Sequence, residues 1–292
     1  MVGKRSLVFG LALFVVVAVA IWFTSLRWRL FGVKGEVGFI TSHVMKSMED
    51  SSDTGYMKLR DYLEEKGYRV GIVRDPVVTL ESVDRFDSCI LFAPERALSR
   101  EEVEAIHSYV ERGGGFLVTS TGWAGGDLSL VNNITDRWGF RFMDTKVYEP
   151  QQGYTDYGVS VGQYTVAGSG LVEDNPIASR ITYPFIMRDS CTINITDPDR
   201  VTRAVTLKGY AFGEDGDLAH QDLKPNREHC EPVGNDAVVM VNGEAGSGRV
   251  VGMGGHKLFN NQWIFQSKPA QNAETLIYIL DWLTERRELT PP

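Results

Sequence analysis

This sequence contains few cysteines and few histidines, and it has no excess of positive charge. Three cysteines and five histidines occur among 292 residues. So few cysteines exclude a small scaffold held together by disulfides. Acidic residues outnumber basic ones by 38 to 30, which gives a formal net charge of −8. This balance argues against a general nucleic-acid-binding protein, because neutralising phosphates requires a basic surface.

The rest of the composition is that of a folded protein. Hydrophobic residues make up 43% of the chain and aromatic residues 11%, which excludes intrinsic disorder. The length has room for one large domain or two small ones. We expect an N-terminal segment at residues 1–34 and one domain at residues 35–290, and the chain shows no internal repeats.

One long apolar run lies near the N-terminus, from Leu7 to Leu26. A run of this length matches the thickness of a bilayer's hydrocarbon core. Trp22 and Trp28 lie where an interfacial aromatic belt is expected. We therefore predict a single transmembrane helix. No other stretch approaches this length, which excludes a multi-pass transporter.

A cleaved signal peptide is the alternative, because Ala18-Val19-Ala20 has the small-x-small form of a cleavage site. The apolar run continues through Phe23 without a polar break, which favours an uncleaved anchor. Basic residues flank the run on both sides and leave its orientation undecided. Two sequons, beginning at Asn133 and Asn194, are compatible with export. We expect a single-pass cell-membrane protein whose soluble part lies outside the cytoplasm.

From residue 36 onward, short apolar segments alternate with amphipathic ones, which is typical of a parallel sheet covered by helices on both faces. The segment that begins at Ser99 has a capping box with Glu102. Asp53 is the expected N-cap of an earlier helix, and Glu64, Glu65 and Glu101, like Glu102, are expected on solvated helix faces. Strands are predicted at residues 37–41, 68–73, 88–93, 116–120, 237–242 and 249–253, and helices at residues 53–66, 100–112, 127–138 and 272–286.

The middle of the chain, at about residues 140–235, has a different pattern. Polar and apolar residues alternate at residues 159–166 and 203–210, which predicts antiparallel strands. Residues 175–181 are expected to form a short helical turn. A β-rich excursion from the main domain is therefore predicted here.

Three segments in this order carry a family resemblance: residues 86–94 (FDSCILFAP), 109–118 (YVERGGGFLV) and 248–255 (GRVVGMGG). The chain resembles the class I glutamine amidotransferase-like superfamily, and within it the non-catalytic branch of DUF4350-type membrane proteins, GldG-type ABC-associated proteins and GIFT domains of intraflagellar transport. The resemblance implies a three-layer, flavodoxin-like α/β fold. It also implies frequent membrane tethering and frequent loss of amidotransferase chemistry.

Amidotransferase chemistry requires a cysteine on a sharp turn after a strand, and a His-x-Glu pair late in the chain. The corresponding turn has Ser120 and Thr121 but no cysteine, and His256 is followed by Lys257. Both requirements fail, so we expect no amidotransferase activity. A surface hydrolase with Ser120 as nucleophile, His256 as base and Glu95 as orienting acid stays open, although Val118 replaces the first glycine of a nucleophile elbow.

Open parallel sheets bind ligands beyond the carboxyl ends of their strands. The resulting rim of candidate binding residues consists of Thr41, Ser42, Pro94, Glu95, Ser120, Thr121, His256 and Asn260.

The other reactive residue types suggest no cofactor and no metal. Cys89 lies in an apolar strand and is expected to be a buried structural thiol. Cys191 and Cys230 lie in polar surroundings and are candidates for a disulfide if the domain is exported, although the sequence leaves their spatial distance open. His220 and His229 have a spacing that fits no common zinc pattern. The sequence thus predicts a membrane-anchored, catalytically inactive binding or assembly module, whose expected partners are subunits of an ABC-type transporter or another membrane complex.

Overall fold

The computed structural model describes residues 33–44, 46–120, 128–148, 165–167, 170–182, 186–188, 190–213, 231–265 and 271–285. Within these ranges no helix is long and apolar enough to span a bilayer. The expected transmembrane helix from Leu7 to Leu26 lies outside the described residues, and so it stays a prediction.

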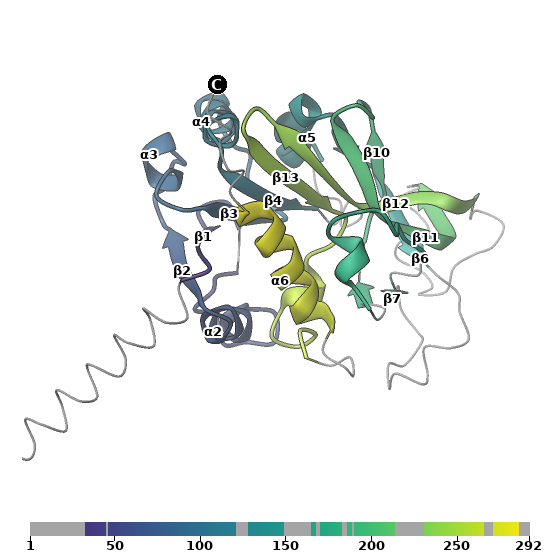
Figure 1. Ribbon diagram of the computed structural model, residues 1–292, viewed down its shortest axis with the longest axis horizontal. Helices are drawn as coiled ribbons and strands as arrows, with labels where there is room; N and C mark the ends of the chain where they lie inside the picture. Colours follow the sequence, from purple (N-terminus) through teal and green to yellow (C-terminus); the bar gives the residue numbers. More distant parts are fainter. Residues whose placement is uncertain are drawn as a thin grey trace, which may run out of the picture.

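A nine-stranded sheet forms the centre of the molecule (Figure 1). Five neighbouring strands are parallel, in the order β2 (Tyr68–Val73), β1 (Gly35–Ile40), β3 (Ser88–Phe92), β4 (Gly115–Thr119) and β13 (Gly248–Met253). The sheet then continues antiparallel through β12 (Glu231–Ala245), β11 (Val201–Gly213) and β6 (Thr145–Tyr148), and β8 (Gly170–Leu171) also pairs with β11. The prediction of a parallel sheet is therefore correct for the five strands from β2 to β13. The β-rich middle of the chain extends this sheet with antiparallel strands.

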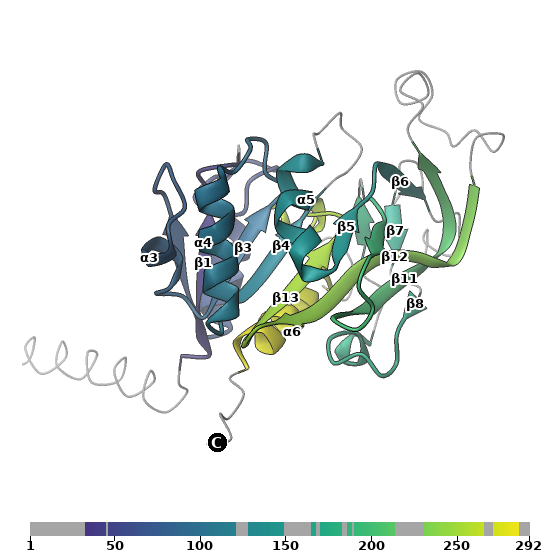
Figure 2. The same cartoon turned by 90° about the horizontal axis from the view of Figure 1, so that it is seen from above.

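Helices cover both faces of the parallel strands (Figures 1 and 2). One layer contains α2 (Met57–Glu65) and α6 (Gln271–Thr284), and the other contains α3 (Leu80–Val83), α4 (Arg100–Glu111) and α5 (Ser129–Thr135). Side chains alternate between the two cores along each strand, as a pleat requires. Ile90 packs with the α2 and α6 layer, whereas Leu91 packs with the α4 layer. This three-layer arrangement is consistent with a flavodoxin-like fold.

Smaller elements complete the middle of the chain. The strands β5 (Phe140–Phe142) and β10 (Ile193–Ile195) pair with each other, as do β7 (Thr165–Ala167) and β9 (Ile186–Arg188). Single 3-10 turns form η1 (Asp136–Trp138), η3 (Ala178–Arg180) and η4 (Lys257–Phe259). The predicted antiparallel strand at residues 203–210 is confirmed within β11, whereas residues 159–164 lie outside the described ranges.

The hairpin between β12 and β13 is tighter than the sequence suggests. The predicted strands at residues 237–242 and 249–253 leave six residues between them, but β12 runs on to Ala245. Only Gly246 and Ser247 separate the two strands, and Gly246 has a φ of 62°. A left-handed φ of this kind is what glycine provides at little cost. The predicted end of this strand was wrong because Gly243 and Glu244 continue the ladder opposite Val250 and Arg249.

The start of α2 also differs from the prediction. The expected N-cap, Asp53, precedes the helix, which begins at Met57 and has no side-chain cap of its own. Asn261 supplies the missing acceptor instead, because its Oδ1 receives the backbone N–H of Lys58 at 2.8 Å. The amide of Asn261 also donates to the carbonyl oxygens of Asp50 and Ser52, at 2.9 and 2.6 Å. A residue about 200 positions away in the chain thus sets where this helix begins.

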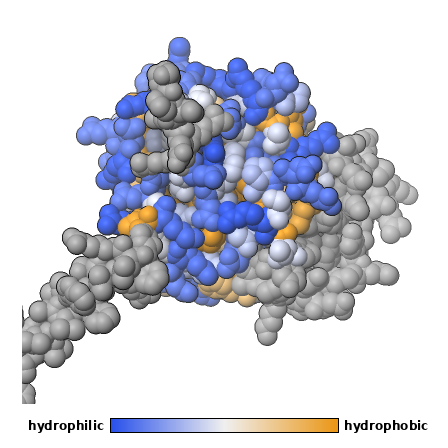
Figure 3. Space-filling model, viewed as in Figure 1, coloured by the Kyte–Doolittle hydropathy of each residue, from blue (hydrophilic) through white to orange (hydrophobic). Residues whose placement is uncertain are grey.

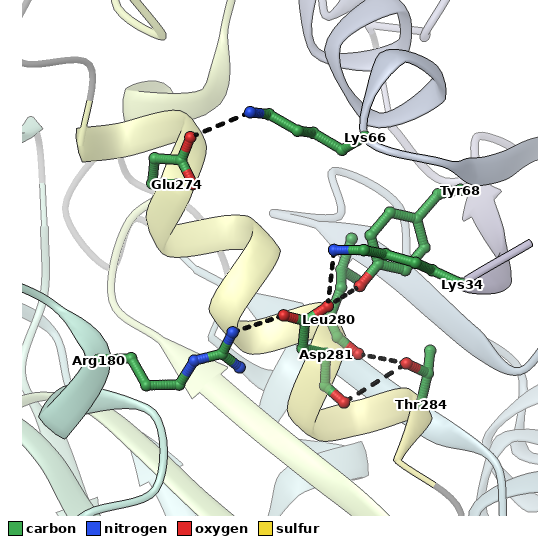
Figure 4. Close-up of polar contacts among 8 residues, drawn as sticks. All are labelled: Lys34, Lys66, Tyr68, Arg180, Glu274, Leu280, Asp281 and Thr284. Carbon is green, nitrogen blue, oxygen red and sulfur yellow. Dashed lines mark hydrogen bonds and ion pairs between the residues drawn. The ribbon is translucent and has the colours of Figure 1, made fainter. Parts of the chain in front are cut away.

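Asp281 links α6 to three other parts of the fold (Figure 4). Its carboxylate accepts hydrogen bonds from the Tyr68 hydroxyl at 2.5 Å and from the Arg180 guanidinium at 2.6 Å. The Lys34 ammonium lies 3.5 Å from the same carboxylate. Burial raises the pKa of Asp281, but the hydrogen bonds from Tyr68 and Arg180 outweigh this and leave the pKa below its usual value. The carboxylate therefore links β2, η3 and the residues that precede β1.

Candidate functional site

The strand order places the expected ligand crevice between β1 and β3. The chain passes from β1 to β2 on one side of β1, and from β3 to β4 on the other side. In open α/β sheets the carboxyl ends of the two strands at such a reversal form the usual binding crevice. The residues at this point are those that follow Ile40 and those that follow Phe92.

A buried imidazole–carboxylate pair occupies one side of this crevice. The Nε2 atom of His43 lies 2.7 Å from Oε1 of Glu102, and these residues are 5% and 4% exposed. The same carboxylate accepts the backbone N–H groups of Val78 and Ser99, each at 2.8 Å. Burial raises the pKa of Glu102, but these donors together with His43 hold it below its usual value. An ionised carboxylate only accepts hydrogen bonds, so His43 donates through Nε2.

The crevice itself is closed by the backbone. The N–H of Glu95 donates to the carbonyl oxygen of His43 at 2.8 Å, which joins the segment after β3 to the segment after β1. The cavity that remains beside it has a volume of about 10 Å³ and is lined partly by Thr41, Tyr56 and Phe92. A volume of this size holds about one water molecule. This cavity is therefore too small for an organic ligand.

The turn that would carry a nucleophile is covered by the middle part of the chain. Ser120 is 6% exposed, and its backbone N–H donates to Met253 at 3.2 Å. The Ser120 hydroxyl hydrogen-bonds the thiol of Cys191, whose own N–H donates to the Gly254 carbonyl at 2.8 Å. A Cβ at Gly254 would lie 2.0 Å from the Cys191 carbonyl oxygen. Cys191 is thus packed directly over the ends of β4 and β13.

His256 lies among aromatic rings at the same edge. Its ring stacks on Phe92 and is tilted against Tyr56, each at a centroid distance of 6.4 Å. Burial, with a smaller contribution from the negative charge of Glu95, raises the pKa of Tyr56 well above its usual value. Glu95 itself is exposed. The structure therefore brings Tyr56, Phe92, Glu95 and His256 together at one edge of the sheet.

Among the other candidate rim residues, Thr41 and Asn260 are hydrogen-bonded within the fold, and Pro94 and Ser42 are buried. The Thr41 hydroxyl donates to the Val73 carbonyl at 3.2 Å, and Pro94 is buried. The Asn260 side chain accepts the N–H groups of Gln262 and Trp263, at 3.1 and 3.0 Å, and so stabilises its own turn. Ser42 is buried beside His43, whereas Thr121 lies outside the described residues.

Sequence reasoning missed the pair of His43 and Glu102. We predicted that Glu102 lies on a solvated helix face, and this was wrong, although Glu64, Glu65 and Glu101 are exposed as expected. The capping box itself is confirmed, because Ser99 and Glu102 exchange both hydrogen bonds. The capping glutamate is visible in the sequence, but its histidine partner is 59 residues away and forms no pattern with it.

The cysteines show no reactive arrangement in the described ranges. Cys89 and Cys191 are fully buried, and burial raises the pKa of each thiol to about 12. Cys89 is thus the buried residue that was expected. Cys230 lies outside the described ranges, so its pairing with Cys191 stays a prediction. No group of three metal-ligating side chains occurs among the residues whose placement is described.

A larger hollow lies at the opposite, amino-terminal edge of the sheet. It has a volume of about 200 Å³, and Asp84, Arg112, Arg249 and Glu285 contribute to its lining. These charges form two ion pairs, Arg112 with Asp84 at 3.4 Å and Arg249 with Glu285 at 3.1 Å. Figure 3 shows that the described surface on the α6 side is mostly hydrophilic, with small, separate apolar areas. Neither feature indicates an apolar ligand.

The sequence profile described as "Domain of unknown function (DUF4350)" matches residues 48–280. The chain belongs to the DUF4350 family. No curated protein sequence matches it. The family match agrees with the DUF4350 part of the resemblance described from the sequence.

Solved structures with a similar fold include the N-terminal domain of mmIFT52, with a TM-score of 0.58 and 16% identity over 88% of this chain and 100% of that one. A putative ThuA-like protein from Bacteroides uniformis has a TM-score of 0.51 and 13% identity, over 87% and 93% of the two chains. A β-galactosidase from Rahnella sp. R3 matches with a TM-score of 0.51 and 12% identity over 88% of this chain, but only 32% of its own. ThuA-like proteins have the class I glutamine amidotransferase-like fold, and at these identities the likeness concerns the fold alone.

Proposed function

We propose that this DUF4350 protein is a membrane-tethered, catalytically silent module that binds a protein partner at the carboxyl edge of its parallel strands. One observation carries the proposal: Cys191 and the segment around it cover Ser120, at the position where an amidotransferase-like enzyme needs an accessible nucleophile. A nucleophile must be reachable by substrate and paired with a base.

The cysteines also support the absence of amidotransferase activity. The turn at residues 117–123 contains no cysteine. The thiols of Cys89 and Cys191 are buried, and their raised pKa values keep them protonated at neutral pH. The thiolate is the nucleophilic form, so neither residue is suited to glutamine hydrolysis.

The carboxyl edge offers a surface rather than a pocket. Glu95 and Arg96 are exposed there, and His256 and Lys257 are half-buried. Both signs of charge therefore occur next to the aromatic residues Phe92 and Tyr56. A surface of mixed charge with aromatic side chains nearby resembles the contact surfaces between proteins. The partner that we infer is a subunit of an ABC-type transporter or of another membrane complex, as the GldG-like and GIFT-like resemblance implies.

The expected anchor would determine which end of the domain lies next to the bilayer. A helix from Leu7 to Leu26 would hold the domain at the bilayer through the amino end of β1, which begins at Gly35. The carboxyl ends of the parallel strands lie at the other end of the sheet, and so face away from the point of attachment. We place the soluble domain outside the cytoplasm.

Co-purification of the full-length, detergent-solubilised chain from native membranes tests the proposal. We expect subunits of a membrane transport complex to be retained, and the double variant Glu95→Arg with His256→Ala to lose them. Arg112→Ala is the matched control, because Arg112 is an exposed residue at the opposite edge. Equal retention by both variants would place the partner elsewhere, and absence of any membrane-protein partner from the unchanged chain would contradict the binding role.

A further inference from the structure

The asparagines of this protein fall into two sets. Eight asparagines have described side chains, and six of these are buried: Asn132, Asn175, Asn242, Asn260, Asn261 and Asn272. The two exposed ones are Asn133 and Asn194. These are also the two that begin an Asn-x-Thr sequon, in Asn133-Ile134-Thr135 and Asn194-Ile195-Thr196. Among the described asparagines, exposure and the sequon therefore coincide.

The buried asparagines are held by the fold. Asn175 donates to the Arg203 carbonyl at 3.0 Å, and Asn272 donates to the Trp263 carbonyl at 3.2 Å. Asn132 exchanges two hydrogen bonds with the backbone of Phe142, at 3.0 and 2.8 Å. Asn133 is the next residue of the same helix, and it points to solvent. The side chain of Asn133 is therefore accessible to a modifying enzyme, whereas that of Asn132 is buried and hydrogen-bonded.

The two sequons lie close together on one face of the molecule. Both sequons adjoin Phe142 of β5. The backbone of Phe142 is hydrogen-bonded by Asn132, the residue before Asn133. Phe142 also pairs across the strands with Ile193, the residue before Asn194. The helix α5 and the strand β10 accordingly both pack against β5. Their apolar residues pack in the same core as α4, on the side of the sheet opposite α6.

We propose that Asn133 and Asn194 are acceptors of N-linked glycans. This inference rests on the proposed location of the domain outside the cytoplasm. The donor is an oligosaccharide linked to a membrane lipid through pyrophosphate, and the transfer is carried out by a membrane oligosaccharyltransferase. A bond forms between the amide nitrogen Nδ2 and the first carbon of the sugar, while the bond from that carbon to phosphate breaks. The amide loses one proton, and the lipid pyrophosphate leaves with the bonding electrons.

The sequon threonines indicate when the transfer takes place. Thr135 is fully buried in the folded protein, whereas Thr196 is exposed. An enzyme that reads the threonine must therefore act on the first sequon before α5 packs, during translocation of the chain. Glycans at these positions would cover the face that carries α5 and β10, and would leave the α6 face uncovered.

Mass spectrometry of glycopeptides from the full-length chain, purified from its own membranes, tests this inference. We expect a sugar mass on both asparagines, and Asn133→Gln and Asn194→Gln each to remove one step of the gel mobility shift. Thr196→Ala must abolish the modification of Asn194, whereas Thr196→Ser must keep it, because serine preserves the sequon. Since Thr196 is exposed, neither change threatens folding.

Unmodified peptides at both asparagines of the folded, membrane-bound chain would overturn the inference. Partner retention is measured on the same preparation. Partner retained without sugar refutes the glycan sites alone, whereas sugar present without any partner refutes the proposed binding function alone.

Discussion

His43 Nε2 and Glu102 Oε1 lie 2.7 Å apart and connect the segment after β1 to the first turn of α4. The contact lies at the β1–β3 crevice, where flavodoxin-like sheets usually bind their ligands. Three donors converge on this one buried carboxylate. A position that in other proteins receives a ligand is here used to stabilise the fold.

Replacing Glu102 with Gln should lower the free energy of unfolding by about 2–3 kcal/mol, because a hydrogen bond to a buried charge is lost and a backbone donor is left unpaired. The pKa of Glu102 is lowered from 4.5 in the folded state. Its stabilising contribution is therefore complete above about pH 4.5 and is lost as the pH falls through the lower, folded-state pKa. Urea unfolding of both proteins at neutral and acidic pH measures this.

Glu101→Gln is the matched control, because Glu101 is the exposed neighbour on the same helix. It should change stability by less than about 0.5 kcal/mol. If Glu102→Gln changed the free energy of unfolding as little as Glu101→Gln, the pair of Glu102 with His43 would contribute nothing to stability.

His107 should make the protein sensitive to mild acid. Burial, assisted by the positive charge of Arg137, lowers the pKa of His107 from 6.5 to about 4. Stability from this residue is complete above pH 6.5 and is lost as the pH falls toward 4, because the unfolded chain binds the proton first. The loss amounts to about 3 kcal/mol.

His107→Phe should remove this dependence while keeping a ring against Trp138, which His107 contacts edge to face at 5.2 Å. The measurement is the free energy of unfolding at several values between pH 4 and 7. A variant with an unchanged pH profile would show that another group controls acid stability.

Asn261→Ala should destabilise the protein by about 2–4 kcal/mol, because it leaves the N–H of Lys58 and two loop carbonyl groups without partners. Gln262→Ala is the control, since Gln262 is exposed and its described hydrogen bonds use its backbone. Thermal unfolding measures the Tm of both variants. We expect Asn261→Ala to lower the Tm and Gln262→Ala to leave it unchanged. An equal Tm for the two variants would contradict the role given to the Asn261 hydrogen bonds.

Ser120 should not react as a hydrolase nucleophile. We expect no labelling of the folded protein by a serine-directed fluorophosphonate, and no glutaminase activity, because Cys191 covers the hydroxyl. Labelling that Ser120→Ala and His256→Ala both abolish would instead establish the serine hydrolase.

Local signals were sufficient to predict most of the parallel half of the fold. The strands around Ile72 and Leu91 and the helix opened by Ser99 depend on residues close to them in sequence. Their periodicity and capping are visible without any tertiary contact. The start of α2 was predicted wrongly because Asn261, from a distant part of the chain, replaces the local cap.

The candidate site was harder to predict for the same reason. The strand ends indicated Ser120, Glu95 and His256, and the structure places all three at the predicted edge. No local pattern indicates that Cys191 packs over Ser120, or that His43 meets Glu102. Contacts between residues far apart in sequence depend on the whole fold, and short motifs do not record them.

Photocrosslinking in native membranes tests the central claim most directly. A photoreactive amino acid is introduced at Glu95 in the full-length chain, and at Arg112 on the opposite edge as a control. We expect a discrete adduct from position 95 that contains a subunit of a membrane transport complex, and none from position 112. Adducts from neither position, together with labelling of Ser120 by the serine-directed probe, would contradict it.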